Sequence, residues 1–419
     1  MKILHIAAHL GGGVGKAHAA LCAADGADVQ RHYLLLEEPR DRRYATAIEQ
    51  AGGTIIVAPD PAIARDLVAQ TDMLQIEWWN HPRLYECLCR WDLPAARTVI
   101  WAHISGLHAP CIPAGLLTAP HRFLFTSACS MEAAAVQALP PKDRTGLGVI
   151  NSGFGFTTPA PTSPERAGNV AYLGTVDFSK LSPDFFAVVD RAEPDTPVSI
   201  WGEVDAGNPV LRRASAMRKP AAVRFAGHTD DPEEVLRQTG IFLYLLQPEH
   251  FGTAENALIE AMSLGCAPLV FDNPAERAIV EHGRTGFIEA DAPAAAERLK
   301  WMLRNPDAVG KIGQAAARSM AKARTATKSA GEFAAIYRDV LSLEKRKTDY
   351  NAILGSTPAE WFLSTLEDPG SPKKDAKGPA RKGTLAHFAQ CFPDDPSFDT
   401  LTNKAAGAET LWSAMRQQH

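Results

Sequence analysis

The chain has 419 residues, more than one hydrophobic core usually encloses, so two domains are expected. Hydrophobic residues make up 46% and charged residues 22%, which excludes a disordered or fibrous protein. The net charge of −5 does not support nucleic-acid binding. Seven cysteines without a Cys-x-x-Cys pair favour reduced thiols. With no secretory signal and no bilayer-spanning apolar run, we expect a cytoplasmic protein.

The first part of the chain alternates apolar runs with polar or amphipathic stretches, as a Rossmann-like α/β sheet does. The strands expected in chain order are residues 1–8, 29–36, 54–57, 73–77, 97–102, 122–126 and 149–150. The helices expected between them are residues 17–24, 40–52 and 61–71, with a further helix that ends at residue 138.

Glycines mark the expected turn between the first strand and its helix, His9 to Lys16. Glycine lets a ligand approach the backbone closely. The turn is not a Walker loop, because Leu10 and Ala17 stand where that motif needs Gly and Ser or Thr. It also departs from the dinucleotide fingerprint. A ligand-binding turn and a tight turn without a ligand are both compatible with this stretch.

Polar side chains recur at the expected carboxyl ends of these strands, where open α/β sheets bind ligands. His103 is a candidate for substrate contact there, with a structural histidine as the alternative. Trp78 and Trp79 suit stacking on a sugar face, although core packing explains them equally well. The polar residues at the strand ends are Glu77, His81, His103, Ser127 and Asn151.

A Pro-, Thr- and Ser-rich segment, Thr157 to Arg166, is the expected linker to a second set of α/β units. Lys180, in the loop after the first strand of this set, is a candidate phosphate partner, with a solvated surface lysine as the alternative. The expected strands are residues 169–173, 198–202, 223–227, 241–246 and 267–272, and the expected later helices are 292–304, 309–323 and 329–343.

The most informative stretch, Ile241 to Asp272, is expected to form strand, loop, helix and strand. Thr253 would cap the helix, with Glu255 in its first turn, where the helix dipole favours an acid. Thr253, Asn256 and Glu260 would then share one face. Free amides of the first turn would bind a phosphate and bring a sugar or nucleoside to Glu260. The alternative is a capped surface helix with a solvated Glu260.

These features form an ordered set along the chain. The set comprises Gly174 with Lys180, the strand 223–227, Glu249-x-Phe-Gly252, Glu260 to Pro268, and Gly283-x-Thr285-Gly286-Phe287, with the Gly-Gly turn near the N-terminus. It resembles a family-4 retaining glycosyltransferase of the GT-B fold, over roughly residues 1 to 340 and most strongly from Gln247 to Ile288. The resemblance implies two Rossmann-like domains that face each other across a cleft.

The resemblance therefore predicts an acceptor-side domain at 1–160, a nucleotide-sugar domain at 161–330, and a helix at 331–347 that returns to the first domain. Residues 348–419 have no counterpart in it and form a C-terminal extension, with a mobile linker at 369–383. The amphipathic segments of this extension could dock on the enzyme, a partner or another subunit, and we expect the protein's own surface.

The resemblance also implies roles for individual residues. Glu260 would bind the donor ribose, and Lys180 would contact the diphosphate. His103 would be the acceptor-side histidine near the sugar. The catalytic residues expected are His103 and Glu249, and the donor-binding residues expected are Gly12, Gly13, Gly174, Lys180, Gly252, Thr253, Ala254, Glu255, Asn256 and Glu260.

Two positions depart from the family pattern. The family places seven residues between two glutamates, whereas ten residues separate Glu249 from Glu260. Either Glu249 keeps its role across a longer loop, or Glu255 or a backbone group takes it. Thr175 stands where the family has an arginine, so the donor would meet fewer cations.

The expected reaction is the transfer of a sugar, with retention and without a metal ion, from a UDP- or GDP-sugar to a glycan, lipid-linked sugar or small molecule. Lys180 and the helix amides would stabilise the leaving diphosphate. A GT-B nucleotide-sugar epimerase and a non-catalytic nucleotide-sugar-binding subunit are the alternatives. Arg40, Arg42 and Arg43 would support at most a peripheral contact with the inner membrane face. The sequence indicates no oligomeric state.

Overall fold

The computed structural model describes residues 1–419 except 27, 40, 155, 157–158, 162, 368–382, 400 and 402–419. The chain divides into two compact units. Unit 1 comprises Met1–Asn151 and Ser329–His419, and unit 2 comprises Ser152–Lys328. The division at residue 151 comes earlier in the chain than the expected boundary at 160. Apart from Gly383, the expected mobile linker 369–383 lies outside the described residues, as does Arg40.

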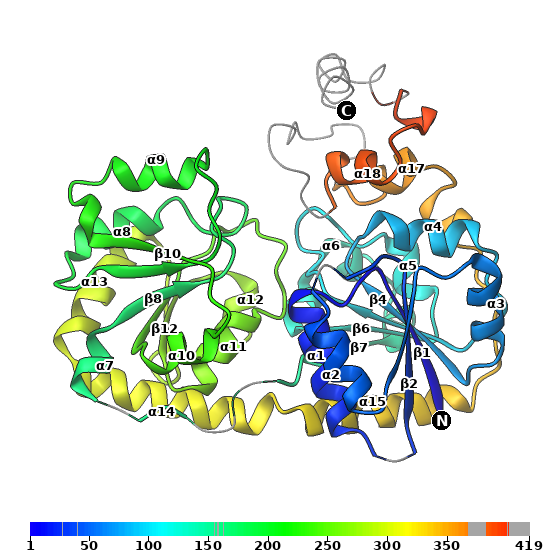
Figure 1. The fold of residues 1–419 in the computed structure, drawn as a ribbon, viewed down its shortest axis with the longest axis horizontal. Helices are drawn as coiled ribbons and strands as arrows, with labels where there is room; N and C mark the ends of the chain where they lie inside the picture. The colour runs from blue at the N-terminus through cyan, green and yellow to red at the C-terminus, as the bar shows by residue number, and fades with distance from the viewer. Residues whose placement is uncertain are drawn as a thin grey trace. The chain divides into compact units, whose positions relative to one another are not determined.

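Unit 1 contains a parallel sheet of seven strands in the order β3-β2-β1-β4-β5-β6-β7 (Figure 1). The central strands are buried along almost their whole length, as expected for strands covered on both faces. The strands are β1 (Lys2–Ala7), β2 (Gln30–Leu35), β3 (Thr54–Val57), β4 (Met73–Trp78), β5 (Thr98–Ala102), β6 (Arg122–Phe125) and β7 (Leu147–Val149).

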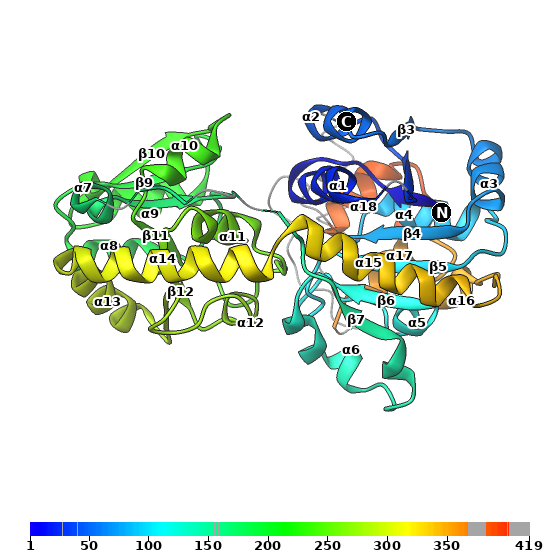
Figure 2. The ribbon, with the colours of Figure 1, turned by 90° about the horizontal axis from the view of Figure 1, so that it is seen from below.

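Helices of unit 1 connect successive strands, and one helix from later in the chain crosses the same sheet. Figure 2 shows this helix, α15 (Ala326–Leu341), running across the strands of unit 1, where the ring of Phe333 packs 4.9 Å from that of Trp101 on β5. The connecting helices are α1 (Gly12–Ala24), α2 (Arg43–Gln50), α3 (Pro61–Ala69), α4 (Pro82–Arg90), α5 (Ala114–Thr118), α6 (Ala134–Gln137) and the 3₁₀ turns Ala128–Glu132 and Asp143–Gly146.

The first helix begins at Gly12, earlier than the expected residue 17. Gly12 has a positive φ of 60°, and a side chain at Gly15 would collide with the carbonyl of Leu10. The glycines therefore allow α1 to start directly against the turn that follows β1. The sequence pattern did not indicate α4, which starts with Pro82 and is capped by the side chain of His81.

Unit 2 contains a second parallel sheet, of six strands in the order β10-β9-β8-β11-β12-β13. Its strands are β8 (Val170–Leu173), β9 (Val198–Trp201), β10 (Val223–Gly227), β11 (Ile241–Tyr244), β12 (Ala267–Phe271) and β13 (Phe287–Glu289). Its helices are α7 (Pro164–Gly168), α8 (Phe185–Ala192), α9 (Pro209–Ser215), α10 (Pro232–Arg237), α11 (Asn256–Ser263), α12 (Pro274–Arg277), α13 (Ala292–Arg304), α14 (Pro306–Ala323) and the 3₁₀ turn Pro220–Ala222.

Helix α11 is held between the sheet of unit 2 and helix α14 (Figure 2). Leu258, Ile259 and Met262 are fully buried on it. The helix is followed by Gly265 at φ 79°, which confirms the expected left-handed glycine. A side chain at Gly313 of α14 would collide with the carbonyl of Gly265, so the two helices pack backbone to backbone at this point.

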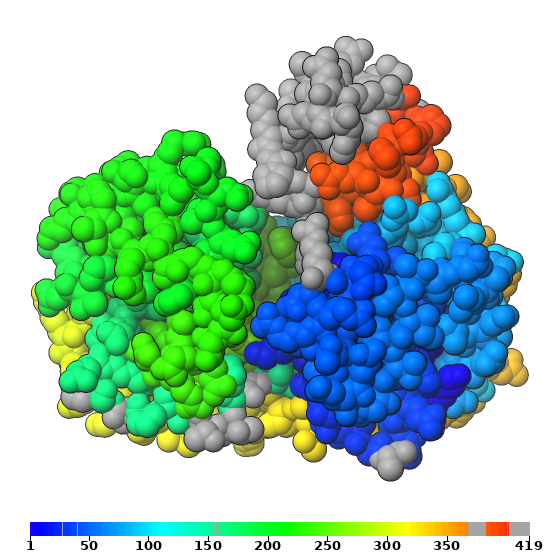
Figure 3. Space-filling model, viewed as in Figure 1, coloured from blue at the N-terminus to red at the C-terminus, as the bar shows by residue number. Residues whose placement is uncertain are grey.

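The described helices of the C-terminal extension pack against α4 (Figures 1 and 3). The rings of Trp361 and Phe388 are fully buried and lie 6.0 Å and 5.5 Å from the ring of Tyr85. The expected docking on the protein's own surface is confirmed for these segments. They are α16 (Tyr350–Leu354), α17 (Pro358–Leu363), α18 (Leu385–Cys391) and the 3₁₀ turn Pro396–Phe398. Among the described helices, none is both long and apolar enough to cross a membrane.

Candidate functional site

Three neighbouring strands of unit 2 end in glycine at the carboxyl edge of the sheet. Gly174, Gly202 and Gly227 follow or end β8, β9 and β10 with φ values of 154°, 147° and 77°. The amide of Gly202 donates to the carbonyl of Gly227 at 2.8 Å, and a side chain at Gly202 would collide with the carbonyl of Gly174. This edge therefore presents bare backbone, which a ligand can approach closely.

The loop that carries Lys180 is fastened to the end of β11. The amide of Gln247 donates to the carbonyl of Lys180 at 2.9 Å, and the amide of Ser182 donates to that of Leu245 at 3.0 Å. These bonds explain why β11 ends at Tyr244 rather than at the expected residue 246: the next residues pair with the Lys180 loop instead. The loop brings Lys180 to the N-terminus of α11.

Lys180 forms an ion pair with Glu255. The ammonium lies 3.1 Å from Oε2 of Glu255 and 5.5 Å from the ring centre of Tyr244, and the Tyr244 hydroxyl donates to the same oxygen at 2.6 Å. The Glu255 side chain is buried, whereas 23% of the Lys180 side chain is exposed. Burial by itself would raise the pKa of Glu255, but the charges of Lys180 and His250 outweigh it and hold this pKa below the ordinary value.

Glu255, not Thr253, occupies the N-cap of α11, so the expected cap is wrong. Glu255 has left-handed φ and ψ of 41° and 57°, and the helix begins only at Asn256. A non-glycine residue in this conformation costs about 1–2 kcal/mol, which is sustained here because its carboxylate is paired and buried. Asn256 and Glu260 remain on the helix, while Thr253 and Ala254 precede it and cannot share its face.

Gly252 makes the inward position of Glu255 possible. A side chain on Gly252 would collide with the Glu255 carboxylate, so only glycine leaves that carboxylate its place. Glu249, in contrast, is exposed. Of the two glutamates that the sequence left open, it is therefore Glu255 that the structure brings to Lys180.

A second buried carboxylate lies behind Glu255, at the far side of His250. His250 Nε2 lies 3.3 Å from Glu276, and the Asn273 side-chain amide donates to the same carboxylate at 3.3 Å. His250 Nδ1 accepts from the amide of Gly252 at 3.1 Å and lies 3.7 Å from Glu255. Burial lowers the pKa of His250, but the two glutamates raise it more, so the net shift is upward.

Sequence reasoning missed His250, Glu276, Asn273 and Tyr244. His250 lies inside the Glu249-x-Phe-Gly252 loop, but nothing in that motif indicates its contacts. Asn273 and Glu276 follow β12, so the strand-end rule that marked Glu77 and His103 could have found them.

Unit 1 contains another buried carboxylate, Glu77, at the carboxyl end of β4. Its oxygens lie 2.8 Å from His5 Nδ1, 3.0 Å from His18 Nε2, 2.9 Å from His103 Nε2 and 2.9 Å from the side-chain amide of Gln75. Burial raises the pKa of Glu77, but the histidine contacts prevail and hold it well below its usual range. His103 is thus joined to a network rather than isolated on its strand end.

One atom from each of His5, His18 and Glu77 lies within 4.8 Å of the others, a spacing that a metal ion could use. His5 Nδ1 and His18 Nε2 already lie 2.8 Å and 3.0 Å from the Glu77 oxygens. The guanidinium of Arg31 also lies 3.0 Å from the other nitrogen of His5, which places a fixed cation against the cluster. These contacts describe a hydrogen-bonded network.

The remaining expected residues of unit 1 lie at the same carboxyl edge of its sheet. Gly12 and Gly13 form the first turn of α1, directly after β1. Trp78 is fully buried in the core, whereas the Trp79 ring lies 4.9 Å from that of His9 and 4.6 Å from that of His81. Gly12, Gly13 and His103 belong to unit 1, while the other expected site residues belong to unit 2.

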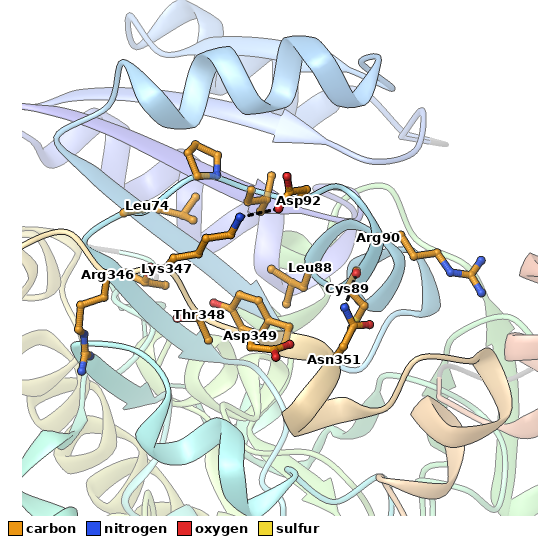
Figure 4. Close-up of a pocket in the computed structure, with 15 residues that line it drawn as sticks. Leu74, Leu88, Cys89, Arg90, Asp92, Arg346, Lys347, Thr348, Asp349 and Asn351 are labelled. Carbon is orange, nitrogen blue, oxygen red and sulfur yellow. Dashed lines mark hydrogen bonds and ion pairs between the residues drawn. The ribbon is translucent and has the colours of Figure 1, made fainter.

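A pocket of about 380 Å³ in unit 1 contains none of these residues (Figure 4). It lies at the opposite, amino-terminal edge of the sheet, where Leu74 and Thr98 stand near the starts of β4 and β5. The segment that leads into α16 closes it, with Lys347 paired to Asp92 at 2.6 Å. This pocket lies where the C-terminal extension leaves the sheet, away from the carboxyl-edge site.

Known proteins resemble the chain in part of its sequence and in its fold. The family described as glycosyl transferases group 1 matches residues 169–319, a segment that contains all the expected site residues of unit 2. No curated protein sequence matches the chain.

Solved structures resemble it over most of its length. HepE from Anabaena, solved with UDP and glucose, has a TM-score of 0.64 at 15% identity, covering 81% of this chain and 100% of that one. A glycosyltransferase from Rickettsia africae has a TM-score of 0.63 at 14% identity, covering 82% and 99%. Sucrose-phosphate synthase from Thermosynechococcus elongatus has a TM-score of 0.59 at 14% identity, covering 82% and 99%.

These likenesses confirm the expected fold class, with two Rossmann-like sheets and a C-terminal extension. The family match confirms the resemblance that the sequence motifs indicated. Residues 169–319 therefore match the glycosyl transferases of group 1, and the chain resembles solved glycosyltransferases in its fold.

Proposed function

We propose that the chain transfers a hexosyl group from a UDP-sugar to an acceptor hydroxyl, with retention and without a metal ion. The observation that carries this proposal is the Lys180–Glu255 ion pair, which holds a partly exposed ammonium at the N-terminus of α11. UDP is favoured over GDP because the structures of HepE from Anabaena contain UDP with glucose or UDP-glucose, and that of TarM from S. aureus contains UDP.

Lys180 would act on the diphosphate of the donor. Its ammonium is the cation of this site, and the amides before α11 add partial positive charge. As the bond to the sugar breaks, negative charge grows on the leaving diphosphate, and fixed donors stabilise it there. With Thr175 in place of the family's arginine, we assign the main cationic contribution to Lys180.

Glu255 would hold Lys180 in place and face the sugar. We assign to it the role that the sequence left open between Glu249 and Glu255, because it is the buried member of the two. Its Oε1 and the Oδ1 of Asn256 are buried acceptors that have no hydrogen-bond partner in the described part of the chain. Such atoms suit sugar hydroxyls, since an unpaired buried acceptor gains most from a donor.

The other assignments follow the family resemblance. Glu260 would bind the ribose, Gly12 and Gly13 would lie near the phosphate or sugar, and His103 would serve the acceptor side. The acceptor would be a glycan, a lipid-linked sugar or a small molecule. Seven free cysteines support a reducing compartment such as the cytoplasm.

Thermal unfolding with UDP-, GDP- and ADP-sugars tests donor binding. A donor at a hundredfold excess over its dissociation constant should add about 2.7 kcal/mol of stability. We expect this gain with a UDP-sugar, its loss in Lys180→Met and Glu260→Ala, and its persistence in Lys311→Met, which alters an exposed lysine on α14. Stabilisation by no donor, or equal stabilisation of Lys180→Met, would contradict the proposed site.

Product analysis tests the reaction itself. We expect UDP release that depends on an acceptor, and a product whose anomeric configuration equals that of the donor. Isomerised UDP-sugar, or UDP release without any acceptor requirement, would indicate an epimerase instead. Donor binding without turnover across a broad acceptor panel would indicate a non-catalytic subunit.

A further inference from the structure

The carboxylate of Glu77 is surrounded by four nitrogen atoms and takes part in hydrogen bonds with three of them. One oxygen faces His5 Nδ1 and the amide nitrogen of Gln75, and the other faces the Nε2 atoms of His18 and His103, all at 2.8–3.0 Å. Three of these contacts are hydrogen bonds, from His5, Gln75 and His103, whereas His18 Nε2 lies near the carboxylate without completing one. Glu77 and the two histidines other than His103 have no exposed side-chain surface.

Arg31 and Tyr337 contact the partners of Glu77 and determine which atoms of those partners donate hydrogen bonds to it. Arg31 always donates, and its guanidinium lies 3.0 Å from His5 Nε2, so that nitrogen must accept and Nδ1 must carry the proton. The hydroxyl of Tyr337 donates to the side-chain oxygen of Gln75, which turns the Gln75 amide nitrogen toward Glu77. Asp25 anchors Arg31 through two hydrogen bonds, of 2.5 Å and 3.0 Å.

The same logic applies to His103. An ionised carboxylate only accepts, so the 2.9 Å contact requires a proton on Nε2 of His103. Burial lowers the pKa of His103, and the contact with Glu77 raises it by less. The net pKa lies below the ordinary value, which favours a neutral ring. A neutral ring protonated at Nε2 carries a lone pair at Nδ1. Of the three rings around Glu77, that of His103 keeps exposed surface, 6% of its side chain.

We propose that Glu77 is a positioning residue, which fixes the ring orientation and tautomer of His103 so that Nδ1 accepts a hydrogen bond from a hydroxyl of the bound sugar or acceptor. This role rests on the proposed transferase function. His103 lies directly after β5, at the carboxyl edge where sheets of this type bind ligands. Glu77 acts on the substrate only through His103, as the orienting member of a carboxylate–histidine pair.

Ring-nitrogen NMR on the full chain, labelled with ¹⁵N in histidine, tests the tautomer without any substrate. His103→Asn identifies the resonances of His103. We expect a protonated Nε2 and a bare Nδ1 at pH 7. A proton on Nδ1, protons on both nitrogens, or a tightly bound metal ion in elemental analysis would overturn the proposal.

Glu77→Gln tests the consequence for catalysis. An amide cannot accept from His5, Gln75 and His103 together, because its nitrogen would face at least one of them, so the His103 ring should lose its single tautomer. We expect kcat to fall about 10- to 100-fold with little change in the KM for the donor. Glu49→Gln, the same change at an exposed site on α2, should leave both unchanged. An unchanged kcat in Glu77→Gln would refute the positioning role.

Two further measurements keep the outcomes separate. Glu77→Asp keeps the negative charge on a shorter side chain. If the position of the carboxylate fixes the His103 ring, this variant should recover less than half of the kcat that Glu77→Gln loses. Circular dichroism and thermal unfolding identify a variant that merely fails to fold, in which case the native ring-nitrogen signals decide. If the native chain turns over no donor, the proposed function fails, and the same signals still decide whether Glu77 sets the tautomer.

Discussion

The Lys180 ammonium lies 3.1 Å from Oε2 of Glu255, although 75 positions separate these residues (255 − 180). The pair joins the loop after β8 to the N-cap of α11, and it replaces the Thr253 cap that the sequence suggested. The buried carboxylate lies beneath the cation and leaves the ammonium partly exposed. An arriving anion therefore meets Lys180 before it meets Glu255.

Glu255→Gln removes the negative charge but keeps the size of the side chain. Breaking a buried ion pair costs about 3–5 kcal/mol, and we expect about 1–3 kcal/mol here because Lys180 is partly exposed. Urea unfolding measures the change. Glu281→Gln, which breaks an exposed pair with Arg284, should cost below about 0.5 kcal/mol. Equal losses in the two variants would contradict the importance of burial.

His250 should make stability depend on pH. Its folded-state pKa is raised above the ordinary value of 6.5, so its contribution is fully present below that pH and is lost as pH rises through the folded value. The unfolding free energy should therefore decline on the alkaline side of 6.5, and His250→Gln should flatten that decline. His228→Gln, at an exposed histidine of unit 2, is the control. An identical pH profile for His250→Gln would show that other groups cause the decline.

Gly252→Ala should damage the site without touching a charged residue. The added methyl group would collide with the Glu255 carboxylate and displace it from Lys180. We expect a loss of about 1–3 kcal/mol of stability and of the stabilisation by UDP-sugar. Gly207→Ala is a matched control, because nothing lies within 4 Å of the added carbon there. Full donor-induced stabilisation of Gly252→Ala would argue against Glu255 as a site residue.

Trp361→Ala should release the C-terminal extension. The ring is fully buried between Tyr85, Phe392 and the guanidinium of Arg90, and truncating such a ring costs about 3–5 kcal/mol. Limited proteolysis should then cut the extension much faster while the rest of the chain stays protected. In Trp301→Ala, which truncates a tryptophan that is 39% exposed, the protease should cut the extension at the native rate. Resistance of the Trp361→Ala extension would show that other contacts hold it.

Local pattern was enough to predict most elements. Strands β1 to β6 and helices α13 and α14 were expected within a few residues, because buried parallel strands and amphipathic helices repeat with different periods. Helix α4 was missed because the polar strand end Asn80-His81-Pro82 reads equally well as a loop. Its start depends on the His81 side chain capping Arg83, a contact that residue pattern does not reveal.

The sequence predicted individual residues of the candidate site, but not the contacts between them. Gly252, Glu255 and Glu260 lie in a single stretch, and the family resemblance marks them. The contacts of Glu77 join residues that lie far apart along the chain, so only the tertiary structure brings them together. The Thr253 cap failed for a related reason: a long-range ion pair fixed the backbone of Glu255 against its local preference.

The glycine that follows β9 limits how this edge of the sheet could be redesigned. A side chain at Gly202 would collide with the carbonyl of Gly174, so that position cannot carry a new contact for a different base or sugar. Substitutions meant to alter donor preference are better made in the Thr175–Ser179 loop and the Gln247–Phe251 loop. A mutant library should therefore leave Gly202 unchanged, because of the three glycines at the ends of β8, β9 and β10 this is the one whose added carbon would collide with backbone.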